Sequence, residues 1–172
     1  MPIVAMVEIR YSSPRGIPTG YNPANVSTKL RNIAQAVVRQ HKEDINRNYY
    51  PKRIASSSER DRNGVPKEFP KRRTGNLRKS VGYAPAAINI STVRKAKSLT
   101  ISLGYDDSIC DPAKFNSLRY GAYGPGRRYL APRRMMPNTA QSVIPIELAK
   151  SNPEPWTPTA EWRPLTWEVV PS

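Results

Sequence analysis

Residues 26–45 read VSTKLRNIAQAVVRQHKEDI, and their apolar side chains recur every three or four positions. This spacing places them along one face of an α-helix. Asn22, Asn25 and Ser27 are alternative candidates for the capping residue at the start of the segment. Pro51 disfavours helical geometry at the residue before it. We therefore predict a helix of roughly 24 residues, about 36 Å long, with an apolar stripe that consists of Val26, Leu30, Ile33, Val37, Val38, His41 and Ile45.

Apolar segments on both sides of this helix predict a small sheet. Residues 3–11, IVAMVEIRY, are rich in β-branched side chains and contain no breaker, which is typical of a strand. Residues 81–92 and 98–106 flank the polar sequence VRKAK, and apolar and polar residues alternate in the second of them. We expect these two segments to form an antiparallel hairpin. The predicted fold class is α+β, with one long N-terminal helix packed on a small, mostly antiparallel sheet.

Proline and charge set two segments apart from this core. The chain has 172 residues, which suits one domain with a single core, and we assign that domain to residues 1–150. Within it, residues 51–73 combine prolines, a serine run and many charges, which indicates a long, exposed basic loop. Residues 151–172 contain five prolines and three tryptophans, so we expect an extended C-terminal arm.

The tryptophans of this arm need a place to pack, because large aromatic side chains are costly to leave in water. One interpretation is that the arm inserts them into pockets of a neighbouring subunit. The other is that the arm folds back on its own domain.

The region between the hairpin and the arm has weaker patterns. We predict a loop around residues 110–112, and a strand or a turn around residues 120–124, where glycines permit close approach of the backbone. Residues 139–150 have an amphipathic pattern, but Pro145 argues for a break or a kink there.

The chain is strongly basic, with a formal net charge of +15. Most of the excess lies in the first 80 residues, and it indicates an acidic partner such as nucleic acid, a membrane surface or an acidic protein face. No apolar run approaches the ~20 residues needed to cross a bilayer, and we see no signal peptide. The single cysteine, Cys110, excludes an intrachain disulfide and fits a reducing compartment. We expect a protein made in a cytoplasm, without a membrane partner.

Few residues suit catalysis or metal binding. The single histidine, His41, lies on the helix stripe, away from the cysteine, and we expect it to be structural. Zinc would require about four Cys or His ligands, and adjacent acids such as Glu43 and Asp44 diverge by about 100° on a helix. The glycines of residues 121–126 lack the spacing of a phosphate-binding loop. We expect no enzymatic activity, no metal and no cofactor.

Two basic clusters are the strongest candidate binding surfaces. They lie in residues 67–80, KEFPKRRTGNLRKS, and residues 126–134, GRRYLAPRR. Such clusters neutralise phosphates, and interleaved tyrosines such as Tyr129 stack on bases. No RRM signature, zinc knuckle or helix-turn-helix pattern accompanies them. A nucleic-acid-binding protein therefore stays an alternative to a protein that contacts acidic protein faces, and to ordinary solvated charge.

Two short motifs, in this order, resemble a known family. Residues 73–81, RTGNLRKSV, resemble the TG-x-L-[RK]-x-S-[IV] element of the tail-completion, or head–tail joining, proteins of long-tailed bacteriophages. Residues 123–140 resemble the later segment of that family, in which a glycine turn leads to an aromatic-Leu-x-Pro element and a C-terminal helix. Tyr129, Leu130 and Pro132 occupy that element here. The resemblance covers about residues 26–150, and it departs from the family where Arg119-Tyr120-Gly121 replaces the usual acidic residue and glycine.

Within the first motif we expect one or two helical turns that lead into a strand. Thr74 and Gly75 would form the turn that ends the basic loop. Leu77 and Val81 are four residues apart and would face the core together.

The resemblance implies a structural virion protein of the phage neck, without catalysis. It would be a ring-forming homo-oligomer that joins the head connector to the tail, assembled in the host cytoplasm during viral assembly. Its partners would be head connector or adaptor proteins and tail tube or tail terminator proteins, with genomic DNA near by in the channel. Another virion part, such as a tail-tube-associated or capsid-decorating protein, is a further alternative. Because arginines and buried aromatic residues dominate interface energetics, the expected partner interface consists of Arg72, Arg73, Arg78, Lys79, Arg127, Arg128, Arg133, Arg134, Trp156, Trp162 and Trp167.

Overall fold

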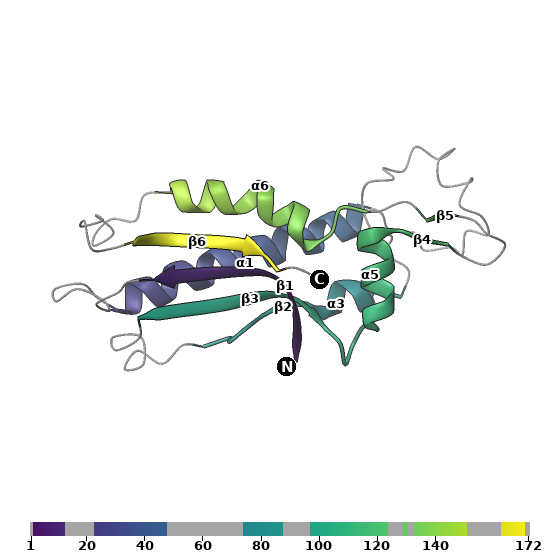
Figure 1. Cartoon of the computed structure of the whole chain (residues 1–172), viewed down its shortest axis with the longest axis horizontal. Coiled ribbons are helices and arrows are strands. Elements are labelled where there is room, and N and C mark those ends of the chain that lie inside the picture. The colour runs from purple at the N-terminus through teal and green to yellow at the C-terminus, as the bar shows by residue number, and fades with distance from the viewer. Residues whose placement is uncertain are drawn as a thin grey trace.

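The computed structural model describes residues 2–12, 23–47, 74–87, 97–123, 129–130, 133–150 and 163–170. In these residues a four-stranded antiparallel sheet is covered on one face by helices, which confirms the predicted α+β class (Figure 1). Its elements are β1 (Ile3–Ser12), α1 (Pro23–Arg47), α3 (Asn76–Ser80), β2 (Val81–Ala84), β3 (Ser98–Asp106), α5 (Pro112–Tyr120), β4 (Ala122–Tyr123), β5 (Tyr129–Leu130), α6 (Met136–Ala149) and β6 (Arg163–Val169).

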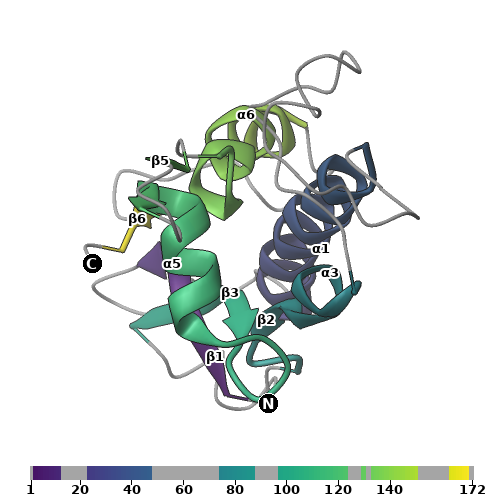
Figure 2. The same cartoon turned by 90° about the vertical axis from the view of Figure 1, so that its right-hand side faces the viewer.

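The long helix α1 packs its apolar stripe against the sheet, as predicted. Leu30, Ile33, Val37 and Ile45 are fully buried, whereas Val38 at the edge of the stripe is half-buried. Figure 2 shows α1 and α6 side by side over the same face of the sheet. Burial of large apolar side chains of this kind contributes about 1.5–3 kcal/mol each, so the stripe is a major source of the stability of the fold.

The sheet has the order β2-β3-β1-β6, with the predicted first strand at its centre. The register of β1 and β3 runs from Ile3 opposite Asp106 to Ser12 opposite Ser98, with an irregularity between Ala5 and Val7. Beyond the irregularity, the side chains of β1 alternate between buried and half-buried. A slip of one residue would move its buried side chains to the other face, so the core fixes the register.

The predicted hairpin is present in the pairing of β2 with β3, from Val81 opposite Tyr105 to Ala84 opposite Ser102. Residues 88–96 lie outside the described residues.

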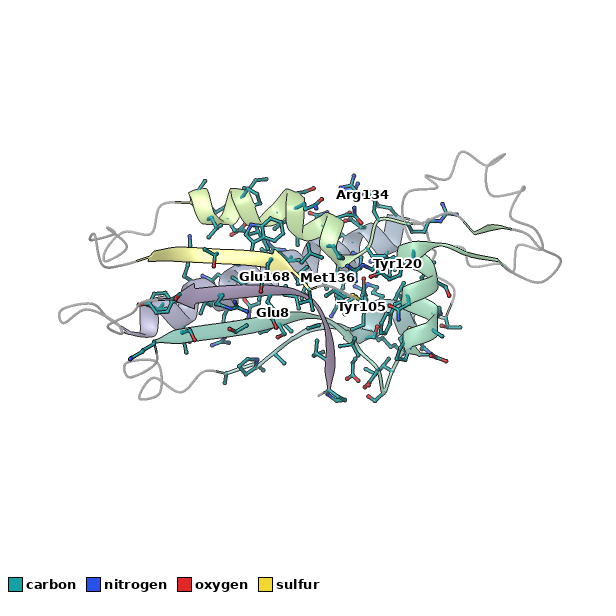
Figure 3. The ribbon with its side chains drawn as sticks, viewed as in Figure 1. Glu8, Tyr105, Tyr120, Arg134, Met136 and Glu168 are labelled. Atoms are coloured by element: carbon teal, nitrogen blue, oxygen red, sulfur yellow. The ribbon has the colours of Figure 1, made fainter. Side chains whose placement is uncertain are left out.

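The uncovered face of the sheet carries a small charge network in which Arg10 bonds to Glu8 at 2.9 Å and to Glu168 of β6 at 3.1 Å. Both glutamates are labelled in Figure 3.

Helix α6 begins earlier than predicted, at Met136, and it runs through Pro145 to Ala149. The expected break at Pro145 is therefore wrong. Pro145 is exposed, so the loss of its backbone donor occurs on the solvent side of the helix. At the end of α6, the Lys29 ammonium of α1 donates to the carbonyl oxygens of Glu147 and Lys150, both at 2.9 Å. These bonds satisfy carbonyls that a helix terminus leaves free.

Helix α5 was not predicted, although its boundaries have recognisable sequence features. Asp111 accepts a hydrogen bond from the Ala113 backbone N–H at 2.8 Å, and Pro112 occupies the first turn. Gly121 ends the helix at φ 80°. The helix was missed because Phe115 is its single fully buried side chain, which leaves no apolar period to detect. The ring of Phe115 stacks on Tyr105 at 4.9 Å between centroids.

The last described segment of the C-terminal arm is strand β6, which adds to the edge of its own sheet. Trp167 lies opposite Ile9 of β1, and its side chain is half-buried against the core. Of the two interpretations of the arm, packing on its own domain holds for residues 163–170. Residues 51–73 and residues 151–162 lie outside the described residues.

Gly104 of β3 gives a sharp test of the β1–β3 contact. A Cβ atom at Gly104 would overlap the backbone carbonyl of Val4, whereas at Gly82 the nearest atom would be the Ile3 Cδ1 at 3.3 Å. We expect Gly104→Ala to lower the free energy of unfolding by about 3 kcal/mol, because backbone must shift. Gly82→Ala, the matched control, should lower it by less than about 1 kcal/mol, since a side chain can move. Urea unfolding measures both, and equal effects would contradict this close approach.

Candidate functional site

The TG-x-L-x-x-S motif forms a joint between the helical layer and the sheet. Gly75 has φ 85°, a left-handed conformation that favours glycine. Its carbonyl accepts the first bond of α3, from the Lys79 backbone N–H at 2.9 Å. Leu77 and Val81 are each 3% exposed, and the buried Ser80 hydroxyl donates to the Leu77 carbonyl at 2.7 Å. The predicted turn, and the inward direction of the two apolar residues, are confirmed.

The same turn directs the two basic residues of the motif away from the core centre. Lys79 is exposed, and Arg78 is half-buried. Arg78 lines an open groove of about 290 Å³ between α1, α3 and β2. The other residues that line it are Gln35, Val38, Arg39, Lys42, Glu43 and Tyr83. We call this feature the basic groove.

The basic groove has an apolar side and a charged side. Val38 and Tyr83 are half-buried and supply apolar surface. The Gln35 side chain holds the tyrosine in place by donating to its hydroxyl oxygen at 3.2 Å. Arg39, Lys42 and Arg78 supply three positive charges against the single carboxylate of Glu43, so the groove has a net positive charge.

These three cations lack a carboxylate partner among the described residues. The Nε atom of Arg78 is buried and has no hydrogen-bond partner in this part of the chain. Burial lowers the pKa of the Lys42 ammonium, and the positive charge of Arg78 lowers it further. Because like charges held close together repel one another, an anionic group placed in the groove would be stabilised.

The second predicted basic cluster is described only at its end. The Arg133 backbone N–H donates to the Leu118 carbonyl at 2.7 Å, and the Arg134 guanidinium donates to the Ser142 hydroxyl at 3.4 Å. Both arginines are half-buried just before α6. Because α3 and α6 lie on different sides of α1 (Figure 2), the structure does not bring these arginines together with Arg78 and Lys79.

The other predicted interface residues divide into two groups. Trp167 packs on the core of its own chain, at the edge of the sheet. The remaining ones lie outside the described residues; they are Arg72, Arg73, Arg127, Arg128, Trp156 and Trp162.

A buried chain of polar groups links α1, β3 and α6. His41 is fully buried, and its Nε2 lies 2.8 Å from the Tyr105 hydroxyl, while its Nδ1 lies 3.2 Å from the Thr139 hydroxyl. The Tyr105 hydroxyl accepts from the Met136 backbone N–H at 3.0 Å; Figure 3 shows both residues near the start of α6. At the other end, the Thr139 hydroxyl donates to Asp44 at 3.3 Å.

This chain of bonds assigns the tautomer of His41. The Thr139 hydroxyl uses its proton toward Asp44, so it must accept the bond from His41, and Nδ1 carries the imidazole proton. Nε2 then accepts the proton of the Tyr105 hydroxyl. Burial lowers the pKa of His41 to about 3 and raises the pKa of Tyr105. Both groups are therefore neutral near pH 7, and every donor in the chain meets an acceptor, which is the structural role expected of His41.

Arg39 and Lys42 were not predicted as functional residues. The sequence did contain the relevant spacing, because Gln35, Arg39 and Lys42 recur at helical intervals beside the apolar stripe. Their combination with Arg78 and Tyr83 could not be predicted from the sequence, since it depends on how α3 and β2 pack against α1.

Within the described parts of the chain, no three Cys, His, Asp or Glu side chains group closely enough to hold a metal ion. No helix in these parts is long and apolar enough to cross a membrane. Compared with known proteins, the chain matches no family model, no curated protein and no solved structure. The structure thus shows a small α+β fold with an open groove of net positive charge.

The buried histidine predicts a specific pH dependence of stability. In the unfolded chain its pKa is about 6.5, whereas in the folded protein it is about 3. Between these values the unfolded state binds the extra proton, so the free energy of unfolding falls as the pH decreases. We expect His41 to remove about 2 kcal/mol of stability between pH 7 and pH 5.

His41→Gln is the comparison, because the chain has a single histidine. The variant should be less stable at pH 7, and its stability should vary less between pH 7 and pH 5. Urea unfolding at a series of pH values measures both slopes. Equal slopes for the two proteins would show that this imidazole does not resist protonation in the folded state.

Proposed function

We propose that this protein is a structural virion protein of the neck of a long-tailed phage. It is a ring-forming subunit that joins the head connector to the tail and completes the tail. The observation that carries the proposal is the place of the TG-x-L-x-x-S motif in the fold. Three of the four fixed residues of the motif have a structural reason there: Gly75 for its positive φ, Leu77 for the core, and Ser80 for its buried bond to the Leu77 carbonyl.

The arrangement of elements also supports the proposal. A long N-terminal helix, the motif, an antiparallel β2–β3 pair, the β4–β5 pair and a later helix follow one another in the order that the resemblance implies. The aromatic-Leu element falls on β5, where Tyr129 pairs with Tyr123. A motif that builds the fold, and carries no catalytic group of its own, suits a subunit whose work is assembly.

The charge of the described surface suits a joint between protein rings. Lys79 is exposed beside the basic groove, and complementary charge across an interface steers association and fixes register. Acidic faces of head connector or adaptor proteins, and of tail tube or tail terminator proteins, are the partners we propose. Closed rings arise from head-to-tail contacts between identical subunits, and genomic DNA would lie near by in the channel of such a ring.

A small nucleic-acid-binding protein is the second candidate. It is favoured by Arg39, Lys42 and Arg78, which have no carboxylate partner among the described residues and which phosphates would also satisfy. Another virion part, such as a tail-tube-associated or capsid-decorating protein, would use the same fold at a different position in the particle.

The solution mass of the purified protein, at low and physiological salt and with or without a DNA duplex, separates these functions. For a neck subunit we expect a discrete oligomer, seen as closed rings by electron microscopy, with little DNA binding at physiological salt. Antibody labelling of the particles should then mark the junction of head and tail. Labelling along the tail or over the capsid would indicate another virion part. DNA affinity that falls steeply with salt, without rings, would instead establish the nucleic-acid-binding protein.

A further inference from the structure

We propose that the basic groove binds residues 151–162 of a second copy of this chain. The inference rests on the proposed function as an assembling subunit, and it names the contact between neighbouring subunits. The groove is the acceptor, and the proline-rich segment between α6 and β6 is the ligand.

The described lining of the groove has an excess of positive charge, with three cations and the one carboxylate of Glu43. Among the described residues the buried Arg78 Nε–H has no acceptor, and the Lys42 ammonium lies close enough to Arg78 for the two positive charges to repel one another. A carboxylate in the groove would pair with the Arg78 guanidinium and offset the repulsion between the two cations. Bonds of this charge-assisted kind are stronger than bonds between neutral groups, and they are made here in a partly desolvated site.

The apolar side of the groove favours a ligand that has an apolar group beside its negative charge. Val38 and Tyr83 line it beside the cations, so a ligand with a carboxylate next to an aromatic or proline ring satisfies both sides. The bases of a nucleic acid also stack on tyrosine rings. The choice of an acidic, aromatic peptide therefore rests on the composition of residues 151–162.

Residues 151–162, SNPEPWTPTAEW, have this composition. They contain Glu154 and Glu161 and no lysine or arginine, in a chain whose net charge is +15. Each glutamate lies within two residues of a tryptophan, Trp156 or Trp162. Three prolines restrict the backbone of the unbound segment, which reduces the conformational entropy lost on binding.

The anchors of this segment favour a second copy over the same chain. Its start is fixed beside α1 by the bond from Lys29 to the Lys150 carbonyl, and its end is fixed at Arg163, opposite Ser12. Twelve residues held at both ends extend at most about 20 Å from their anchors. Between Lys29, beside the start of the segment, and Arg39, in the groove, α1 rises about 15 Å. This distance along the helix uses most of the reach of the segment.

The route within one chain must also cross α1. The groove lies on the side of α1 that faces α3 and β2, whereas α6 and β6 lie on the other side (Figure 2). A neighbouring copy approaches the groove directly, without this detour. Because the groove and the segment are different surfaces, the contact is head-to-tail and can close a ring.

Full-length variants test the contact from both sides. The groove variant carries Arg39→Glu and Lys42→Glu, and the segment variant carries Glu154→Lys and Glu161→Lys. The control variant carries Lys97→Glu and Lys114→Glu, two exposed positions outside the groove with the same change in charge as the groove variant. Analytical ultracentrifugation measures association, and circular dichroism checks that each variant folds.

We expect the unaltered chain and the control variant to self-associate, and the groove and segment variants to be monomeric. An equimolar mixture of these two variants should associate again, because each supplies a complementary surface. A labelled peptide of residues 151–162 should bind the segment variant, whose groove is intact. The groove variant, or a peptide with both glutamates changed to glutamine, should weaken this binding by at least about ten-fold, as expected for the loss of one charge-assisted hydrogen bond.

Several results would overturn the inference. Rings formed equally well by the groove variant would place the subunit contact elsewhere, while the ring-forming function itself would stand. An unaltered chain that stays monomeric would also contradict the inference. If the peptide then binds the segment variant, the segment docks within one chain; if the peptide does not bind, the segment does not dock in the groove. A groove variant that loses affinity for a DNA duplex, without any peptide binding, would assign the groove to nucleic acid. Absence of rings together with steeply salt-dependent DNA binding would overturn the proposed function as well.

Discussion

Packing of the apolar face of α1 against the sheet organises the whole molecule. Leu30, Ile33 and Val37 are completely removed from solvent against strands that come from both ends of the chain. Because this face of α1 is fixed against the sheet, the two flanks of the helix have defined neighbours. One flank receives α6, and the other receives α3 and β2 (Figure 2). The basic groove exists because the second flank is only partly filled.

Polar interactions then fix how the second helix is seated. The chain of bonds from Met136 through Tyr105, His41 and Thr139 to Asp44 joins three elements in a buried site. The Lys29 bonds at the far end of α6 hold that helix at a second point. Directional bonds in a low-dielectric interior penalise a shifted arrangement strongly, so apolar packing provides the stability of the α1–α6 pair and these bonds specify its alignment.

The proposed assembly uses what this arrangement leaves unsatisfied. Among the described residues, the Nε atoms of Arg31 and Arg78 are buried without a hydrogen-bond partner, and Arg78 lines the groove. Charges that repel one another within a monomer are tolerated when a partner neutralises them. In a ring, the same residues that weaken the isolated subunit would strengthen the contact between subunits, which couples the fold to assembly.

Local patterns were sufficient for much of this protein. The period of the apolar residues predicted α1, and the Thr74-Gly75 sequence predicted the turn before Leu77. A run of β-branched residues without a breaker predicted β1, and alternation predicted β3. These features depend on neighbours in the chain, so they can be recognised without a fold.

Helix α5 has too few buried residues to show a period, and Pro145 lies on an exposed face where its missing donor is tolerated. The pairing of β6 with β1 and the meeting of Arg39, Lys42 and Arg78 join residues far apart in the sequence. Contacts of that kind have no local pattern, because packing against α1 and β1 creates them.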